Sequence, residues 1–265
     1  MSILEQRLDL PGCSLAFHDS GGAGRAVVFL HGAGADHVTF LHQATALRSA
    51  GHRVVLADLR GHGRSHSTTL PPRAELLLDD VAALIAARGL ERPVLVGHSL
   101  GGNIAQALVR CSPREMSGLF VMGATWNTGP LSRVDRGLLG LAAPGLALIP
   151  AARLPRLLAN ASATTDVARE DARRAFSQVT KAEFLEIWRA TVAFVVPDPG
   201  YRTPVPLGLL RGERDRTGNI ATAMPAWAAH EGVTDIVVAE AGHFVSQDRP
   251  DLVTDALLRF LERLD

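Results

Sequence analysis

Cysteine is scarce in this chain of 265 residues, which contains only Cys13 and Cys111. The two lie far apart in the sequence and match no ligand spacing of a zinc site, so we expect neither a disulfide framework nor a bound metal. Glu5 and Arg7 interrupt the apolar residues of the N-terminus, which argues against a secretion signal. Two free thiols in a cytoplasmic protein are the expectation.

An excess of charge of either sign is also absent. The 27 Lys and Arg residues balance 27 Asp and Glu residues. Because phosphate contacts dominate nucleic-acid binding, a neutral chain without a dense basic run predicts no nucleic-acid partner. The longest uncharged stretch, residues 137–152, contains two prolines and is shorter than the ~20 residues that a membrane-spanning helix needs. We therefore expect no membrane span, and no pattern indicates an oligomeric state.

Short apolar runs rich in β-branched residues alternate with longer segments of helical periodicity. Runs that are apolar throughout are typical of strands buried on both faces of a parallel sheet. The alternation predicts a doubly wound, mostly parallel α/β sheet, preceded by an antiparallel hairpin over residues 4–18. The expected parallel strands are residues 26–30, 53–57, 93–96, 119–122, 206–210 and 235–238.

The alternation is interrupted over residues 125–203, where Ala, Leu and Arg dominate and no strand-like run appears. Pro144, Pro150 and Pro155 divide this segment into short helices that need a partner surface. We expect residues 1–124 and 204–265 to form the core, and residues 125–203 to form a helical cap inserted in it.

The pentapeptide Gly97-His98-Ser99-Leu100-Gly101 lies between an apolar run and a helical segment. This is the context of a nucleophile elbow, a sharp turn that lifts a serine hydroxyl above the sheet. The flanking glycines allow the close approach that such a turn requires. The Leu100 N–H then lies at a helix N-terminus, where it can donate to an oxyanion. The motif predicts Ser99 as a nucleophile.

Three more strand exits carry unusual residues. His31-Gly32-Ala33-Gly34 suits a loop that offers a second backbone N–H, that of Ala33, to the oxyanion. The last two strands end in Gly212-Glu213-Arg214-Asp215 and Gly242-His243-Phe244. A serine nucleophile needs an imidazole base, which in turn needs a carboxylate to hold its tautomer. These residues supply both in the chain order Ser, Asp, His.

Over essentially its whole length the sequence resembles the α/β-hydrolase superfamily. The resemblance implies that Ser99 is the nucleophile, His243 the general base and acid, and Asp215 the orienting acid, with Glu213 a distant second. It also implies that Ala33 and Leu100 are the oxyanion donors, that a cap covers the nucleophile, and that no cofactor is used. The motifs that carry it are His31-Gly32-Ala33-Gly34, Asp58-Leu59-Arg60-Gly61-His62-Gly63-Arg64-Ser65, Gly97-His98-Ser99-Leu100-Gly101-Gly102, Gly212-x-x-Asp215 and Gly242-His243.

The serine favours acyl transfer to water, so we expect a serine esterase or lactonase. Because the chain has no net charge and residues 137–152 of the expected cap are uncharged, we expect small to medium-sized neutral substrates. A C–C bond hydrolase, a cofactor-free perhydrolase or haloperoxidase, an aminopeptidase-like enzyme and a non-catalytic small-ligand receptor remain alternatives. Arg173 and Arg174 could hold a substrate carboxylate if they faced the pocket. The residues expected to line the substrate pocket are His31, Gly32, Gly34, His98, Trp126, Trp188 and Phe244.

Overall fold

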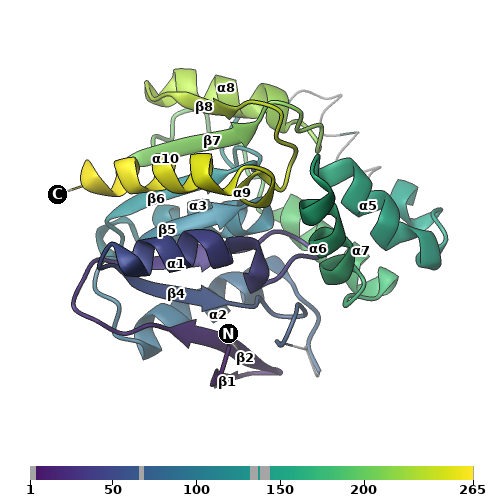
Figure 1. Cartoon of the computed structure of the whole chain (residues 1–265), viewed down its shortest axis with the longest axis horizontal. Helices are drawn as coiled ribbons and strands as arrows, with labels where there is room; N and C mark the ends of the chain where they lie inside the picture. Colours follow the sequence, from purple (N-terminus) through teal and green to yellow (C-terminus); the bar gives the residue numbers. More distant parts are fainter. Residues whose placement is uncertain (1–3, 66–68, 132–136, 138–143, 265) are drawn as a thin grey trace.

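The computed structural model describes residues 4–65, 69–131, 137 and 144–264. These residues form one sheet of eight strands in the order β1-β2-β4-β3-β5-β6-β7-β8 (Figure 1). The first two strands pair with their neighbours in antiparallel fashion, and the other neighbouring strands run parallel. The strands are β1 (Gln6–Leu10), β2 (Cys13–Asp19), β3 (Ala26–Leu30), β4 (Arg53–Ala57), β5 (Val94–His98), β6 (Gly118–Met122), β7 (Leu207–Gly212) and β8 (Asp235–Val238).

The expected α/β fold is confirmed, and the apolar runs explain why. β3, β5 and β6 are buried along their whole length, as strands covered on both faces must be. Successive side chains of β3 alternate between two apolar clusters: Val28 and Leu30 belong to one, Val27 and Phe29 to the other. The N-terminal hairpin is also present, because Leu10 pairs with Cys13 across a two-residue loop.

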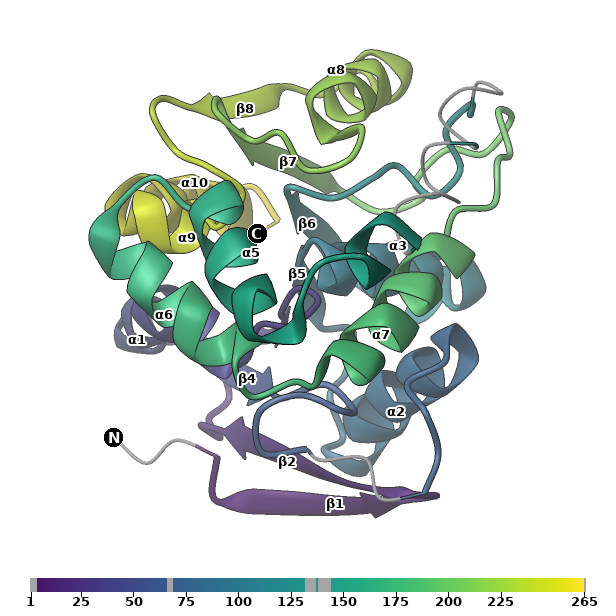
Figure 2. The same ribbon diagram turned by 90° about the vertical axis from the view of Figure 1, so that its right-hand side faces the viewer.

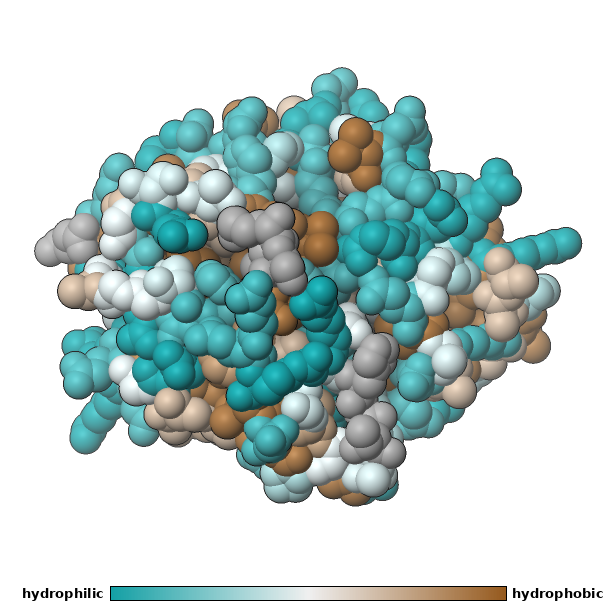
Figure 3. Space-filling model, turned by 60° about the horizontal axis from the view of Figure 1, so that its bottom comes forward, coloured by the Kyte–Doolittle hydropathy of each residue, from teal (hydrophilic) through white to brown (hydrophobic). Residues whose placement is uncertain are grey.

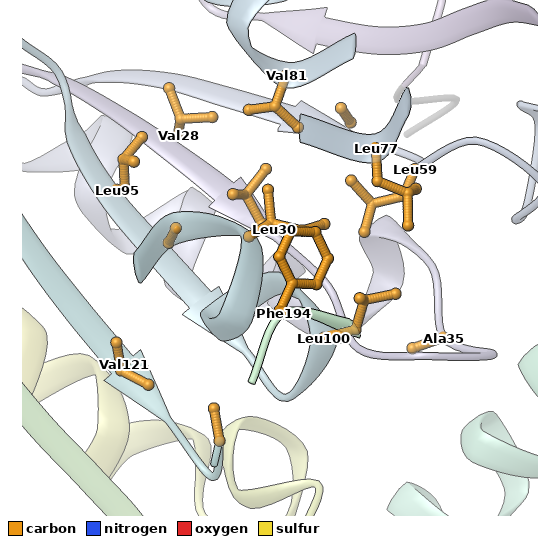
Figure 4. Packing of buried hydrophobic residues seen from close by; sticks show 14 of the residues in the cluster. Val28, Leu30, Ala35, Leu59, Leu77, Val81, Leu95, Leu100, Val121 and Phe194 are labelled. Atoms are coloured by element: carbon orange, nitrogen blue, oxygen red, sulfur yellow. The ribbon is translucent and has the colours of Figure 1, made fainter. Parts of the chain in front are cut away.

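Helices cover both faces of the sheet. On one face, α1 (Leu41–Ser49) and α10 (Pro250–Glu262) pack against each other and against the strands. On the other lie α2 (Ala74–Ala87), α3 (Leu100–Cys111) and α8 (Ile220–Glu231). Figure 4 shows Leu77 and Val81 of α2 in the same buried cluster as Val28 and Leu30 of β3, with Leu77 beside Leu59. Within the described ranges, no helix is both long and apolar enough to cross a membrane.

Between β6 and β7 the chain forms the helices α5 (Leu154–Ser162), α6 (Asp166–Phe176) and α7 (Lys181–Ala193), which lie beyond one end of the sheet in Figure 1 and in front of the strands in Figure 2. Thr165 caps α6, and Thr180 with Glu183 forms a capping box on α7. Residues 132–136 and 138–143, which include part of the uncharged stretch 137–152, lie outside the described residues. Below, residues 125–203 are called the cap.

Two buried carboxylates of the core hold the cap in place. Asp36, after β3, accepts both Nη1–H and Nη2–H of Arg174 at 2.7 and 2.9 Å, and Gln178 Nε2–H at 3.1 Å. Asp248, at the end of α9 (Val245–Asp248), accepts the backbone N–H groups of residues 164–165 at 2.8 to 3.0 Å. The cap is therefore attached at both ends of α6.

The face nearest the β1 edge shows hydrophilic side chains over most of its surface (Figure 3). Apolar residues appear there as small patches between polar ones, which is ordinary for a protein surface.

Candidate active site

Ser99 connects β5 to α3 in a strained conformation, with φ of 52° and ψ of −118°. Positive φ is costly for a residue with a side chain and is typical of functional turns. Both flanking glycines are needed for the turn. A Cβ on Gly97 would lie 2.4 Å from the Gly101 carbonyl oxygen, and a Cβ on Gly101 would lie 1.9 Å from that of Leu30. The sharp turn expected from the pentapeptide is therefore present.

His243 and Asp215 meet after the last two strands. His243 Nδ1–H donates to Asp215 Oδ2 at 2.8 Å, and the Thr217 N–H donates to Asp215 Oδ1 at 2.8 Å. Burial acts to raise the pKa of Asp215, but the charge of His243 and the hydrogen bonds from His243 and Thr217 outweigh it and lower the pKa. Glu213 points elsewhere, since its carboxylate accepts the Glu240 N–H at 3.0 Å. The structure brings Asp215, and not Glu213, to the imidazole.

The residue after β6 leaves room for this pair. Gly123 has φ of 49°, and a Cβ there would lie 3.2 Å from Asp215 Oδ2 and 3.3 Å from His243 Nδ1. A side chain at this position would press on the carboxylate and the imidazole together. The position after β6 therefore holds a glycine, and the acid that contacts His243 comes from the loop after β7.

Ser99 and His243 line the same cavity, which has a volume of about 660 Å³ and lies between the strand ends and the cap. Of the residues predicted to line a substrate pocket, Gly32, His98 and Phe244 line this cavity from the core, and Trp188 lines it from α7. The cap contributes an apolar wall. Its larger members are Leu146, Ile149, Leu158, Phe176, Phe184 and Trp188.

The two candidate oxyanion donors flank Ser99. Ala33 lines the cavity in the loop after β3. Leu100 is the first residue of α3, and the first N–H groups of a helix have no acceptor within it. A Cβ on Gly32 would lie 3.1 Å from Ser99 Cβ, so the Ala33 loop passes close to the serine. The Leu100 N–H is therefore next to Ser99 in the chain, and the loop that carries the Ala33 N–H is next to Ser99 in space.

His31 and Gly34 do not line the cavity, which differs from expectation. His31 is fully buried, where its Nδ1–H donates to the Gly32 carbonyl and its Nε2 accepts the Leu59 N–H, both at 2.9 Å. A Cβ on Gly34 would lie 2.5 Å from Phe176 Cδ1. His31 therefore orients two loops from below, and Gly34 allows the cap to pack on the loop after β3.

Trp126 also lies outside the cavity. Its ring stacks on Trp227 of α8, with a centroid distance of 6.3 Å and an interplanar angle of 3°, and lies 4.9 Å from the His230 ring. The next residue, Asn127, donates its N–H to Gln106 Oε1 of α3 at 2.8 Å. This bond directs the chain along α3, so Trp126 does not reach the cavity that it was expected to line.

His98 supports His243 through the backbone. Its Nε2–H donates to the His243 carbonyl oxygen at 2.8 Å, and the two rings lie 4.6 Å apart. Burial and the neighbouring His243 lower the pKa of His98 to about 3, so this imidazole is neutral at pH 7. His98 therefore fixes the backbone of His243 in addition to lining the cavity.

Asp248 was not identified from the sequence, although it holds the loop that carries His243. Its Oδ2 accepts the Gly242 N–H at 2.8 Å, while the Phe244 N–H donates to the Ser162 carbonyl at 2.9 Å. The loop is therefore fixed between α9 and the end of α5. Among the many acidic residues of the chain, nothing in the local sequence distinguished this one.

Arg216 is a second residue that the sequence did not reveal. It is exposed and lines the cavity, and its Nη1 approaches the carbonyl oxygens of Glu213 and Asp215 at 3.4 and 3.3 Å. Arg173 and Arg174, the basic pair considered from the sequence, both form ion pairs and do not line the cavity. Arg216 directly follows Asp215 in the sequence, and this position beside a predicted site residue was the feature that could have indicated it.

Comparison with known proteins agrees with this fold. The model of the alpha/beta hydrolase family matches residues 27–256, and the chain belongs to this family.

Three similar proteins illustrate the range of relatives. An enol-lactonase from Burkholderia xenovorans superposes with a TM-score of 0.83 at 22% identity, covering 97% of this chain and 100% of that one. A thermophilic esterase from Thermogutta terrifontis gives a TM-score of 0.78 at 24% identity over 98% and 99% of the two chains. A 2-hydroxy-6-oxononadienedioate/2-hydroxy-6-oxononatrienedioate hydrolase of Paraburkholderia phymatum is 32% identical over 111 residues, or 40% of this chain and 38% of that protein. The members of this family are generally hydrolytic enzymes that act on small molecules.

Proposed function

We propose that this protein is a serine hydrolase that cleaves carboxylic esters or lactones through an acyl-enzyme. The observation that carries the proposal is the meeting of a strained serine with a buried imidazole–carboxylate pair in one cavity. Ser99 has φ of 52° and lines the cavity with His243, whose Nδ1–H donates to Asp215. A serine hydroxyl is a poor nucleophile until such a base is available.

In the proposed mechanism, Ser99 Oγ attacks the substrate carbonyl carbon while His243 Nε2 accepts the hydroxyl proton. Asp215 holds the imidazole in the required tautomer and stabilises the imidazolium. The N–H groups of Ala33 and Leu100 donate to the oxyanion. His243 then protonates the leaving alkoxide, and a water molecule activated by His243 hydrolyses the acyl-enzyme. Released acid and free Ser99 complete the cycle.

The shape of the cavity favours substrates with an apolar acyl part. Its cap wall includes Phe176, Phe184 and Trp188, and apolar walls with few polar groups are typical of small-molecule sites. The similar esterase and enol-lactonase structures are the reason for placing esters and lactones first. Amides are poorer substrates in this proposal, because their leaving groups need closer protonation by His243.

The test combines active-site labelling with a substrate panel. A fluorophosphonate reacts with an activated serine, so the wild-type protein should be labelled and Ser99→Ala should not. The panel compares matched esters, lactones, amides and diketones by kcat/KM. Turnover of esters or lactones that is lost in Ser99→Ala supports the proposal. Labelling equal in both proteins, or turnover of the diketone alone, contradicts it.

A further inference from the structure

We infer that Arg216 makes this cavity selective for esters or lactones that carry a second, free carboxylate, such as half-esters of dicarboxylic acids. This inference rests on the proposed hydrolase function and concerns its substrate class. It replaces the expectation of a neutral substrate, which was based on the zero net charge of the chain and its uncharged cap segment.

The cavity has two unlike walls. The cap wall is apolar, whereas residues 216–219 and Thr222 form a polar wall on the side of β7 and α8. The polar wall contains hydrogen-bond donors. Asn219 Oδ1 accepts the Thr125 hydroxyl at 3.0 Å, which leaves the Asn219 NH₂ group as a donor. A ligand that matches both walls has an apolar body and an anionic or acceptor group.

Arg216 supplies the charge on this wall. Among the described residues that line the cavity, it is the only Lys, Arg, Asp or Glu. Its two contacts to carbonyl oxygens, at 3.4 and 3.3 Å, are long for hydrogen bonds to a guanidinium and use the same nitrogen. Across the described part of the chain, no carboxylate oxygen lies within 4.0 Å of Arg216. The other guanidinium N–H groups can therefore receive a carboxylate, for which their geometry is suited.

Two other arginines, Arg174 and Arg214, differ from Arg216 because each of them faces a carboxylate of the protein. Arg174 is held by Asp36 and Asp171, and Arg214 faces Glu240 at 3.7 Å outside the cavity. Their charges are compensated by the protein itself. The uncompensated charge at Arg216 lies in the same cavity as Ser99, so an anionic substrate gains an attraction that a neutral one lacks.

The experiment compares 4-nitrophenyl hemiglutarate, a monoanion, with neutral 4-nitrophenyl pentanoate. We expect the wild-type protein to favour the anionic ester through a lower KM, and this preference to weaken with added salt. Arg216→Gln should reduce the anionic-to-neutral ratio of kcat/KM at least tenfold, and Arg216→Lys should retain part of it. Arg214→Gln is the matched control, because it removes the same charge two residues away, and it should keep the ratio.

A binding measurement separates this inference from the proposed function. Calorimetry with monomethyl glutarate on Ser99→Ala should show binding that weakens at least tenfold when Arg216→Gln is added. Loss of the preference with Arg216→Gln but not with Arg214→Gln supports the inference. If Arg216→Gln changes both esters equally, or leaves the binding of monomethyl glutarate unchanged, the inference is wrong while ester hydrolysis stands. If the wild type hydrolyses neither ester but still binds monomethyl glutarate through Arg216, the hydrolase proposal fails instead.

Discussion

The core and the cap of this protein differ in how directly their sequence specifies their structure. The core strands agree with the predicted apolar runs to within two residues. For β3, β5 and β6 the reason is that strands buried on both faces must be apolar throughout. The cap was recognised as helical, but α5, α6 and α7 expose much of their surface and carry many charged residues. Their positions depend on contacts with distant residues such as Asp36 and Asp248.

The two regions also differ in what they bring to the cavity. The core supplies Ser99, Asp215 and His243, and the cap supplies most of the apolar wall. A substitution in the core should therefore damage the chemistry or the fold. A substitution in the cap should act on substrate binding or have a small effect. The following predictions test this contrast.

The largest effect is expected at the proposed nucleophile. Ser99→Ala should lower kcat by ~10⁴ or more with the fold retained, because in the proposed mechanism the serine and the histidine act as one unit. His243→Ala should be as severe, and Asp215→Asn should also be strongly impaired. The measurements are kcat for 4-nitrophenyl esters and circular dichroism.

Two controls define this result. Glu213→Gln tests the other acid of the loop, and Arg173→Gln tests an exposed position on the cap. Both should retain near-normal kcat. If Glu213→Gln were inactive and Asp215→Asn active, the assignment of the acid would be wrong.

The next effect is on stability, at a glycine of the elbow. Gly101→Ala should lower the free energy of unfolding by about 3 kcal/mol or more, because the new Cβ would lie 1.9 Å from the Leu30 carbonyl oxygen. Gly200→Ala in the cap places its Cβ 3.8 Å from Asp198 Oδ1 and should change stability by less than about 0.5 kcal/mol. Urea denaturation measures both. Equal losses of stability at the two glycines would contradict the expected difference between the core and the cap.

Acid sensitivity between about pH 4.5 and 6.5, the range in which histidines rather than carboxylates titrate, should be a property of the core, since residues 125–203 contain no histidine. Burial lowers the pKa of both His62 and His98 to about 3. Between pH 3 and about 6.5 the unfolded chain therefore binds protons at these positions that the folded protein does not bind. The contribution of these two histidines to the free energy of unfolding is fully present above about pH 6.5. It falls on acidification, by up to about 1.4 kcal/mol per pH unit for each histidine.

His62→Asn tests this pH dependence away from the reacting groups. Asparagine can donate a hydrogen bond, as His62 Nδ1–H does to the Arg60 carbonyl at 3.0 Å. A plot of the free energy of unfolding against pH should have a shallower slope between pH 5 and 6.5. The decrease should be up to about 1.4 kcal/mol per pH unit, the contribution of one histidine. An unchanged slope would show that His62 is not protonated on unfolding in this range.

The smallest effect is expected where the cap is paired with the core. Arg174→Gln should lower the free energy of unfolding by about 1–2 kcal/mol, because solvent screens the Arg174 side chain, which is 41% exposed, but the Asp36 carboxylate, which is 4% exposed, loses its charged partner. Because Asp36 lies on the loop that carries Ala33, the variant should also have a raised KM for 4-nitrophenyl esters, while the protein stays folded. A loss of several kcal/mol would mean that the cap is as integral to the fold as the strands.

The sequence by itself located the strands and the helical segment between β6 and β7, and it led to the prediction of Ser99, Asp215 and His243 as the reacting residues. These depend on local requirements: apolar residues along buried strands, and glycines beside a sharp turn. Tertiary structure alone decided that Trp126 stacks on α8, that His31 lies beneath the cavity, and that Asp248 and Arg216 have a place at the site. Each of these depends on which distant segments become neighbours, and a partner from another part of the chain leaves no mark in the local pattern.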